Sequence, residues 1–192
     1  MSGRLLIAGV GNIFLGDDGF GVEVAARLAS AQLPGWAHVV DYGIRGMHLA
    51  YDLANGYQSM ILIDATARGS EPGTIYVIEP DLQPLTGDAA VDGNPLFNAH
   101  GMQPDVVFGM LGMLDSADPE GRPPGSPRGS SKHVIVVGCE PASLDHGMGL
   151  SEPVAAAVDE AVRVVLDLVA GMDDGEQQLV GKERTHVPRD PR

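Results

Sequence analysis

Residues 60–64, Met-Ile-Leu-Ile-Asp, are apolar at every position up to the carboxylate that closes them. An unbroken apolar run of this length is typical of a strand buried on both faces, as in a parallel sheet, whereas a half-exposed strand alternates. The sequence therefore predicts a central buried strand here. Four further strands are expected on similar grounds, at Arg4–Val10, His38–Asp41, Thr74–Ile78 and His133–Gly138.

Segments with helical spacing of apolar residues separate these strands. The clearest follows Ser151, a good N-cap residue, and repeats its apolar positions from Val154 to Val169. Other helices are expected at Phe20–Ala29, at Met47–Leu53, where the turn-forming pair Asn55-Gly56 would stop the helix, and at Asp105–Leu114. Alternating strands and helices predict an α/β fold, a mostly parallel twisted sheet with helices on both faces in a three-layer sandwich.

The length of 192 residues favours one α/β domain over 1–170. It would contain a flexible Pro/Gly/Ser-rich loop at about 116–131 and be followed by a polar, disordered tail at 171–192. The formal charge of −14 argues against a nucleic-acid partner, since such partners need clustered Lys and Arg. No apolar run approaches the ~20 residues of a membrane helix, and no signal peptide is evident, so a cytoplasmic protein with no membrane partner is expected.

Candidate chemistry gathers where the expected strands end. Asp17 and Asp18 follow the first strand, Asp64 closes the central one, and His100 lies in a long connection. Because ligands of open α/β sheets bind beyond the carboxyl ends of the strands, two carboxylates and an imidazole could converge there. Such an oxygen and nitrogen set suits a divalent metal such as zinc or nickel, which could polarise a carbonyl or activate water.

Simpler interpretations of the same residues stay open at this point. Asp17-Asp18-Gly19 is also typical of a turn and helix N-cap, Asp64 could cap the turn after its strand, and a loop histidine such as His100 is often solvated. Cys139, the only cysteine, cannot form an internal disulfide and is expected to be an inert thiol.

Two other ligand classes fit less well. Gly9-Val10-Gly11 resembles the start of a dinucleotide-binding loop, but Phe14 stands where the third glycine belongs. A phospho-receiver domain would use Asp17, Asp18 and Asp64 around magnesium, and is the better alternative. A receiver also needs a lysine after a late strand, whereas Lys132 precedes the strand at 133–138.

The chain resembles a known family, the hydrogenase maturation proteases, which process the large subunit of nickel–iron hydrogenases. The resemblance runs from about Leu5 to about Leu168 and rests on several motifs in a fixed order. These are Gly9-Val10-Gly11-Asn12, Gly16-Asp17-Asp18-Gly19-x-Gly21, Ile63-Asp64-Ala65, Pro72-Gly73, His100, Val137-Gly138-Cys139-Glu140-Pro141 and Gly149-Leu150-Ser151.

The resemblance implies an endopeptidase that removes a C-terminal extension from the nickel-loaded large-subunit precursor. Asp18, Asp64 and His100 match the three metal ligands of the family, and the metal would be nickel contributed by the substrate. No Ser–His–Asp or Cys–His arrangement is evident, so either water attack on a metal-polarised carbonyl or general-base catalysis by a carboxylate would serve. A nickel-binding chaperone without peptidase activity would use the same residues.

One loop departs from the family pattern. After the second strand the family usually has an Asp-Gly-Gly-Thr-like loop, whereas this chain has Asp41-Tyr42-Gly43-Ile44-Arg45-Gly46. Glycines let the backbone turn tightly beside a ligand, so Gly43, Arg45 and Gly46 are the expected substrate-binding residues.

Overall fold

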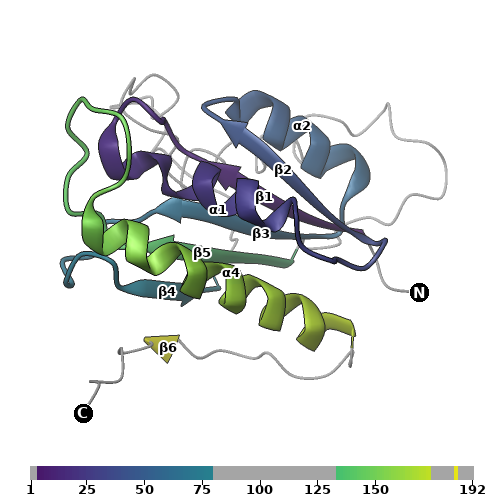
Figure 1. The fold of residues 1–192 in the computed structure, drawn as a ribbon. Coiled ribbons are helices and arrows are strands. Elements are labelled where there is room, and N and C mark those ends of the chain that lie inside the picture. Colours follow the sequence, from purple (N-terminus) through teal and green to yellow (C-terminus); the bar gives the residue numbers. More distant parts are fainter. Residues whose placement is uncertain (1–3, 80–132, 174–183, 186–192) are drawn as a thin grey trace, which may run out of the picture.

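The computed structural model describes residues 4–79, 133–173 and 184–185 (Figure 1). His100, the expected helix at 105–114, the loop at about 116–131 and most of the 171–192 tail lie outside these residues. The elements, in chain order, are β1 (Leu5–Val10), the 3-10 helix η1 (Gly16–Gly19), α1 (Phe20–Leu28), β2 (Ala37–Gly43), α2 (Gly46–Gly56), β3 (Ser59–Ala65), β4 (Ile75–Ile78), β5 (His133–Cys139), α4 (Glu152–Asp173) and β6 (Arg184–Thr185).

The strands form one sheet in the order β2-β1-β3-β5-β4-β6. The first four of these run parallel, with β3 and β1 at the centre, while β4 is antiparallel to both β5 and β6. The predicted α/β architecture with a mostly parallel sheet is therefore confirmed. The parallel strands end on the same side of the sheet, which is the left-hand side of Figure 1.

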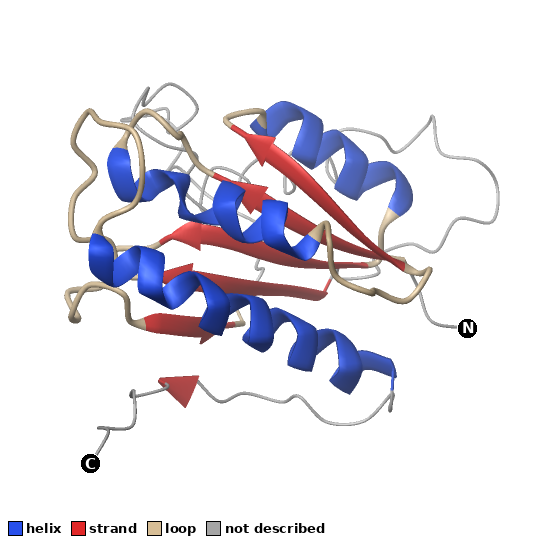
Figure 2. Cartoon of the chain, viewed as in Figure 1, coloured by secondary structure: helices blue, strands red, loops and turns tan. Residues whose placement is uncertain are grey.

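Helices cover both faces of the sheet (Figure 2). Successive side chains of a strand point to opposite faces, so each buried strand contributes to two cores. On one face Ile7, Ile61 and Ile135 pack with residues of α1 and α4, among them Phe20. On the other, Leu62 and Val136 pack with Leu49 and Leu53 of α2. Burial of each such side chain contributes roughly 1.5–3 kcal/mol, which explains the unbroken apolar runs.

One local prediction differs from the structure, and a second is confirmed in its position only. The helix expected to stop before Asn55-Gly56 continues to Gly56, and the backbone becomes extended at Tyr57. That turn signal is overridden because α2 packs on the sheet through Leu49 and Leu53, which holds the end of the helix in place. Ser151 does precede α4, and its carbonyl accepts a bond from Ala155, but its hydroxyl donates to Asp17.

Among the described helices, none combines the length and the apolar character needed to cross a membrane.

Candidate active site

The loops at the carboxyl ends of β1, β2, β3 and β5 form one edge of the molecule, called here the carboxyl edge. Figure 1 shows this edge at the left, where the β5–α4 loop passes beside the segment that joins β1 to α1. Asp17, Asp18 and Asp64 all lie at this edge, as the parallel topology requires.

The glycines of the first motif allow the backbone of α1 to lie directly on the strand ends. A Cβ at Gly21 would lie 2.2 Å from the carbonyl oxygen of Ile63, and one at Gly11, whose φ is +131°, would lie 1.8 Å from that of Asp18. Real side chains do not fit at such distances. The glycines therefore serve close packing of η1 and α1 against β1 and β3, which brings Asp18 next to the end of β3.

Asp18 is half-buried, and its Oδ2 accepts a hydrogen bond from the backbone N–H of Asn12 at 2.6 Å. Burial raises the pKa of Asp18 above its usual value, and the bond from Asn12 offsets this only in part. The N-cap interpretation of the Asp pair is wrong, because η1 precedes α1, Gly19 occupies the cap position and no side chain caps the helix there.

Asp64, the last residue but one of β3, is only 3% exposed. Its pKa is raised well above the usual value, first by burial and then by the negative charge of Asp18, while the N–H of Ala65 acts in the opposite direction. The charge of Asp18 acts on Asp64 because the fold brings these two residues, which are distant in sequence, close to each other. Two such carboxyl groups resist simultaneous ionisation unless a cation or a proton lies between them.

Asp17 has the opposite environment from its neighbour. Its side chain is fully buried and accepts hydrogen bonds from the N–H groups of Ala142, Ser143 and Ser151 and from the Ser151 hydroxyl, at 2.6–3.1 Å. Burial alone would raise the pKa of Asp17, but these hydrogen bonds outweigh it and the pKa is lowered. Asp17 therefore holds the β5–α4 loop against η1. Both of its carboxylate oxygens accept hydrogen bonds from that loop.

The third expected ligand, His100, lies outside the described residues. Within residues 4–79, 133–173 and 184–185, no three His, Cys, Asp or Glu side chains group together as a metal site. The described part of the site therefore consists of the Asp18–Asp64 pair.

Comparison with known proteins places this chain in a family. The model of the hydrogenase maturation proteases, HycI, matches residues 22–90. A Methanocaldococcus jannaschii protein assigned to the hydrogenase maturation proteases is 34% identical over 166 residues, which cover 84% of this chain and 94% of that protein. The chain belongs to the hydrogenase maturation protease family.

Other similarities extend over nearly the whole of this maturation protease. The Escherichia coli hydrogenase 2 maturation protease is 26% identical over 95% of this chain and 99% of its own length. The solved structure of the E. coli hydrogenase maturating endopeptidase HybD superposes with a TM-score of 0.62, at 27% identity, over 88% of this chain and 93% of that one. The protein is thus an endopeptidase of hydrogenase maturation, and these comparisons do not support the receiver or chaperone alternatives.

In this maturation protease the loop after β2 also reaches the carboxyl edge. The carbonyl of Gly43, whose φ is +51°, accepts a hydrogen bond from the N–H of Gly11 at 3.0 Å. Arg45 is exposed, but its guanidinium donates to the carbonyls of Tyr42 and Asp41 in its own loop. Gly46 is buried at the start of α2. The structure therefore places Gly43 next to the β1 loop, with Arg45 and Gly46 two and three residues farther along, and their role in substrate binding stays a prediction.

Sequence reasoning missed the role of Glu140, which follows β5 and is 5% exposed. Its carboxylate accepts hydrogen bonds from the N–H groups of Arg68 and Gly69, at 2.7 and 3.1 Å, and from the Tyr76 hydroxyl at 2.6 Å. These hydrogen bonds lower the pKa of Glu140 although burial opposes them. Glu140 thereby holds the loop between β3 and β4; a charged residue directly after a buried strand is the sequence signal for such a role.

Cys139 is buried at the end of β5. Burial, with the negative charges of Asp17 and Glu140, raises the pKa of this thiol to about 12. The protonated thiol is a poor nucleophile, as expected of a residue outside the catalytic chemistry.

Proposed function

We propose that this protease removes the C-terminal extension of a nickel–iron hydrogenase large-subunit precursor, and that Asp18, Asp64 and His100 bind the nickel ion of that precursor. The observation that supports this assignment is the Asp18–Asp64 pair, two neighbouring carboxyl groups with raised pKa values at the carboxyl edge. His100 is included because it matches the third ligand of the family motif.

The electrostatics of the pair suit a site that meets its cation only when the substrate arrives. Without a cation, burial and mutual repulsion disfavour the simultaneous ionisation of both carboxyl groups. When a divalent cation binds, its charge favours ionisation of both groups, so binding releases protons and strengthens as pH rises. Nickel belongs to the substrate in this scheme, and an imidazole beside two carboxylates is a donor set that it accepts.

The same groups can assist hydrolysis of the scissile peptide bond. Nickel held between the precursor and the carboxylates would polarise the scissile carbonyl toward attack by water. Alternatively, an ionised carboxylate of the pair would act as general base and accept a proton from the attacking water. Asp64, which is the more deeply buried of the two, is the residue on which we expect activity to depend most.

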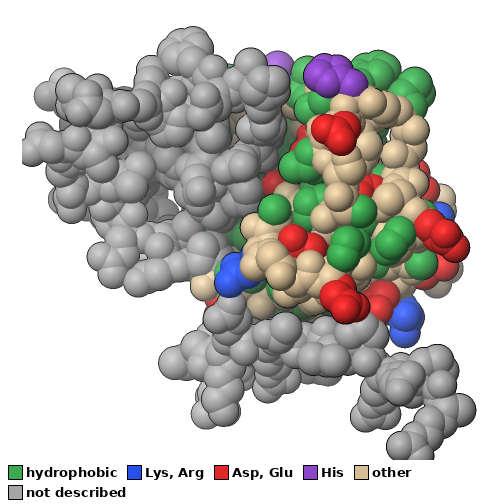
Figure 3. All heavy atoms as spheres, turned by 90° about the vertical axis from the view of Figure 1, so that its left-hand side faces the viewer, with side chains coloured by type: hydrophobic (Ala, Val, Ile, Leu, Met, Phe, Trp, Pro, Cys, Tyr) green, Lys and Arg blue, Asp and Glu red, His purple; other side chains and the backbone are tan. Residues whose placement is uncertain are grey.

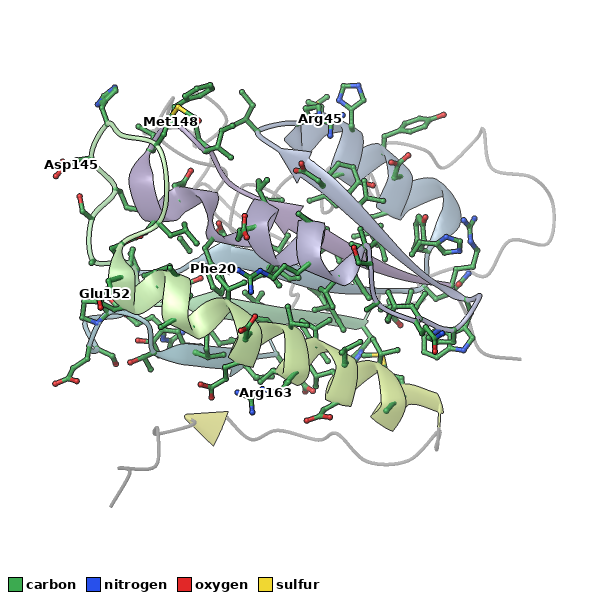
Figure 4. The ribbon with its side chains drawn as sticks, viewed as in Figure 1. Phe20, Arg45, Asp145, Met148, Glu152 and Arg163 are labelled. Carbon is green, nitrogen blue, oxygen red and sulfur yellow. The ribbon has the colours of Figure 1, made fainter. Side chains whose placement is uncertain are left out.

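The test is incubation of a nickel-loaded large-subunit precursor with the wild type and with Asp18→Asn, Asp64→Asn and His100→Ala, followed by intact mass measurement of the precursor. We expect the wild type to shorten the precursor and each variant to lose at least 100-fold in rate, because each removes a ligand. Asp145→Asn is the matched control, since Asp145 is an exposed carboxylate of the β5–α4 loop at the same edge (Figure 4).

Full processing by the three variants would contradict the site assignment. A wild type that binds the precursor without shortening it would instead contradict the protease function. Mass measurement separates these outcomes, because the first shows the shortened product and the second does not. The cytoplasmic location stays a prediction.

A further inference from the structure

Exposed apolar side chains gather at the carboxyl edge. Of the seven large hydrophobic side chains that are exposed in the described residues, six belong to the loops of this edge or to the first turn of α2. The most exposed are Met148 at 77% and Met47 at 69%. The six are Ile13, Phe14, Ile44, Met47, Leu144 and Met148, called here the apolar rim.

The space-filling view onto this edge agrees with that distribution. In Figure 3 hydrophobic side chains are spread over the described part of the face, with several carboxylates between them. Figure 4 shows Met148 on the β5–α4 loop and Arg45 just before α2, so these two residues come from two separate loops. Six exposed large apolar side chains on one edge, with polar groups between them, are a composition that interaction surfaces of proteins share.

The apolar rim stands on backbone that is held in place. Gly147 donates to the carbonyl of Phe14 and accepts from the N–H of Gly16, both at 2.9 Å, so the β1 and β5 loops pair with each other. The Gly11–Gly43 bond joins the β1 loop to the β2 loop at 3.0 Å. Because the loops are fixed, little conformational entropy is lost when a partner covers them, which favours binding.

A groove adjoins the apolar rim. Ile13 and Met148 line it together with Val22 of α1 and Leu150, and its volume is about 360 Å³. Glu23 and Arg27 of α1 form the polar part of its lining. A groove of this size accepts one or two apolar side chains of a partner and gives the surface a shape that can be recognised.

We propose that the apolar rim is the docking surface for the folded body of the large-subunit precursor, an inference that rests on the proposed function. Asp64 is only 3% exposed at the floor of the same edge, so a protein whose peptide reaches it must cover the surrounding loops. Recognition then has two parts. The carboxylates take the nickel and the scissile peptide, and the apolar rim takes an apolar surface of the protein that carries them.

The net charge of the chain indicates which charged residues border the contact surface of that partner. With a formal charge of −14, the protease attracts a partner whose apolar contact surface is bordered by Lys and Arg. The exposed Arg45 guanidinium at this edge donates to backbone carbonyls of its own loop and is a single positive charge against the net charge of −14.

The test measures steady-state processing of the nickel-loaded precursor, and its dissociation constant, for Phe14→Ser, Met148→Ser and the double variant. Tyr51→Ser is the matched control, since Tyr51 is 66% exposed but lies farther along α2, outside the rim. We expect each rim variant to raise KM and Kd about tenfold and the double variant more, with kcat reduced less than twofold. The control should change KM less than twofold.

Three results would overturn the docking surface: unchanged KM and Kd in the double variant, an equal rise in Tyr51→Ser, or a wild-type dimer that the rim variants convert to monomers. The last result would show that the rim joins two copies of the chain. Failure of the proposed function is a separate outcome, because then no variant or wild type shortens the precursor. The Kd values still test docking in that case.

Discussion

The carboxylate of Asp17 accepts two hydrogen bonds from Ser151, one from the backbone N–H at 2.6 Å and one from the hydroxyl at 2.9 Å, across 134 residues of sequence. The bonds join η1, which precedes α1, to the residue that precedes α4. The adjacent carboxylate of Asp18 bonds instead to Asn12, close enough to β3 for its charge to act on Asp64. Two consecutive aspartates thus have different surroundings, since Asp17 is bonded into the scaffold and Asp18 lies beside Asp64.

We expect Asp17→Asn to destabilise the protein by about 2–4 kcal/mol, because it replaces a buried acceptor of four hydrogen bonds with a group that must also donate. Urea unfolding at pH 7 measures the change. Ser151→Ala, which keeps the backbone bond to Asp17, should cost only about 1 kcal/mol. The pKa of Asp17 is lower in the folded state than in the unfolded state. Its contribution to the free energy of unfolding is therefore complete above the unfolded-state pKa and is lost as pH falls through the folded-state pKa. Equal, small effects of both variants would contradict the scaffold role.

We expect Asp64→Asn to stabilise the metal-free protein at pH 7, by about 1 kcal/mol or more, although it abolishes processing. The folded-state pKa of Asp64 lies above its unfolded value, so ionisation opposes folding at any pH above the unfolded pKa. The advantage of the variant should therefore vanish near pH 3 and grow as pH rises toward neutrality. Chemical unfolding at several pH values tests this, with the exposed Asp167→Asn on α4 as control. A variant that is less stable than the wild type at pH 7 would contradict the claim that ionisation of Asp64 opposes folding.

We expect Gly21→Ala to destabilise the fold by about 3 kcal/mol or more, since its Cβ would lie 2.2 Å from the Ile63 carbonyl and 2.3 Å from that of Val10. The helix would have to move away from the strand ends, and Asp18 with it. Gly171→Ala, in open space on α4, should stabilise the protein by up to about 1 kcal/mol. Thermal unfolding compares the two, and a tolerated Gly21→Ala would show that α1 does not need this close approach.

We expect Cys139 to be unreactive in the native protein. It is 1% exposed and its pKa is raised to about 12, so thiol reagents at pH 8 should modify it only when the protein unfolds. Mass measurement after brief iodoacetamide treatment, with and without urea, provides the comparison. Cys139→Ser should process the precursor within about threefold of the wild-type rate, and a complete loss would point to a catalytic thiol instead.

The direction of β4 could have been predicted from the length of the connection that precedes it. The strand at 74–78 was expected, but its direction was not. A parallel strand after β3 needs a crossover connection of a dozen or more residues, usually a helix, and residues 66–74 are too few for one. The chain therefore turns back at the carboxyl edge and β4 pairs antiparallel to β5.

The amino-acid sequence by itself determined the buried strands, the helices between them, the family and the candidate residues Asp18 and Asp64. These depend on apolar periodicity, on glycines and on motifs, each of which is local in the chain. Only the tertiary structure decided the role of the neighbouring Asp17, because the donors that hold its carboxylate come from residues 142, 143 and 151. It also decided that both pKa values of the Asp18–Asp64 pair are raised, since burial and the approach of two distant charges are products of packing.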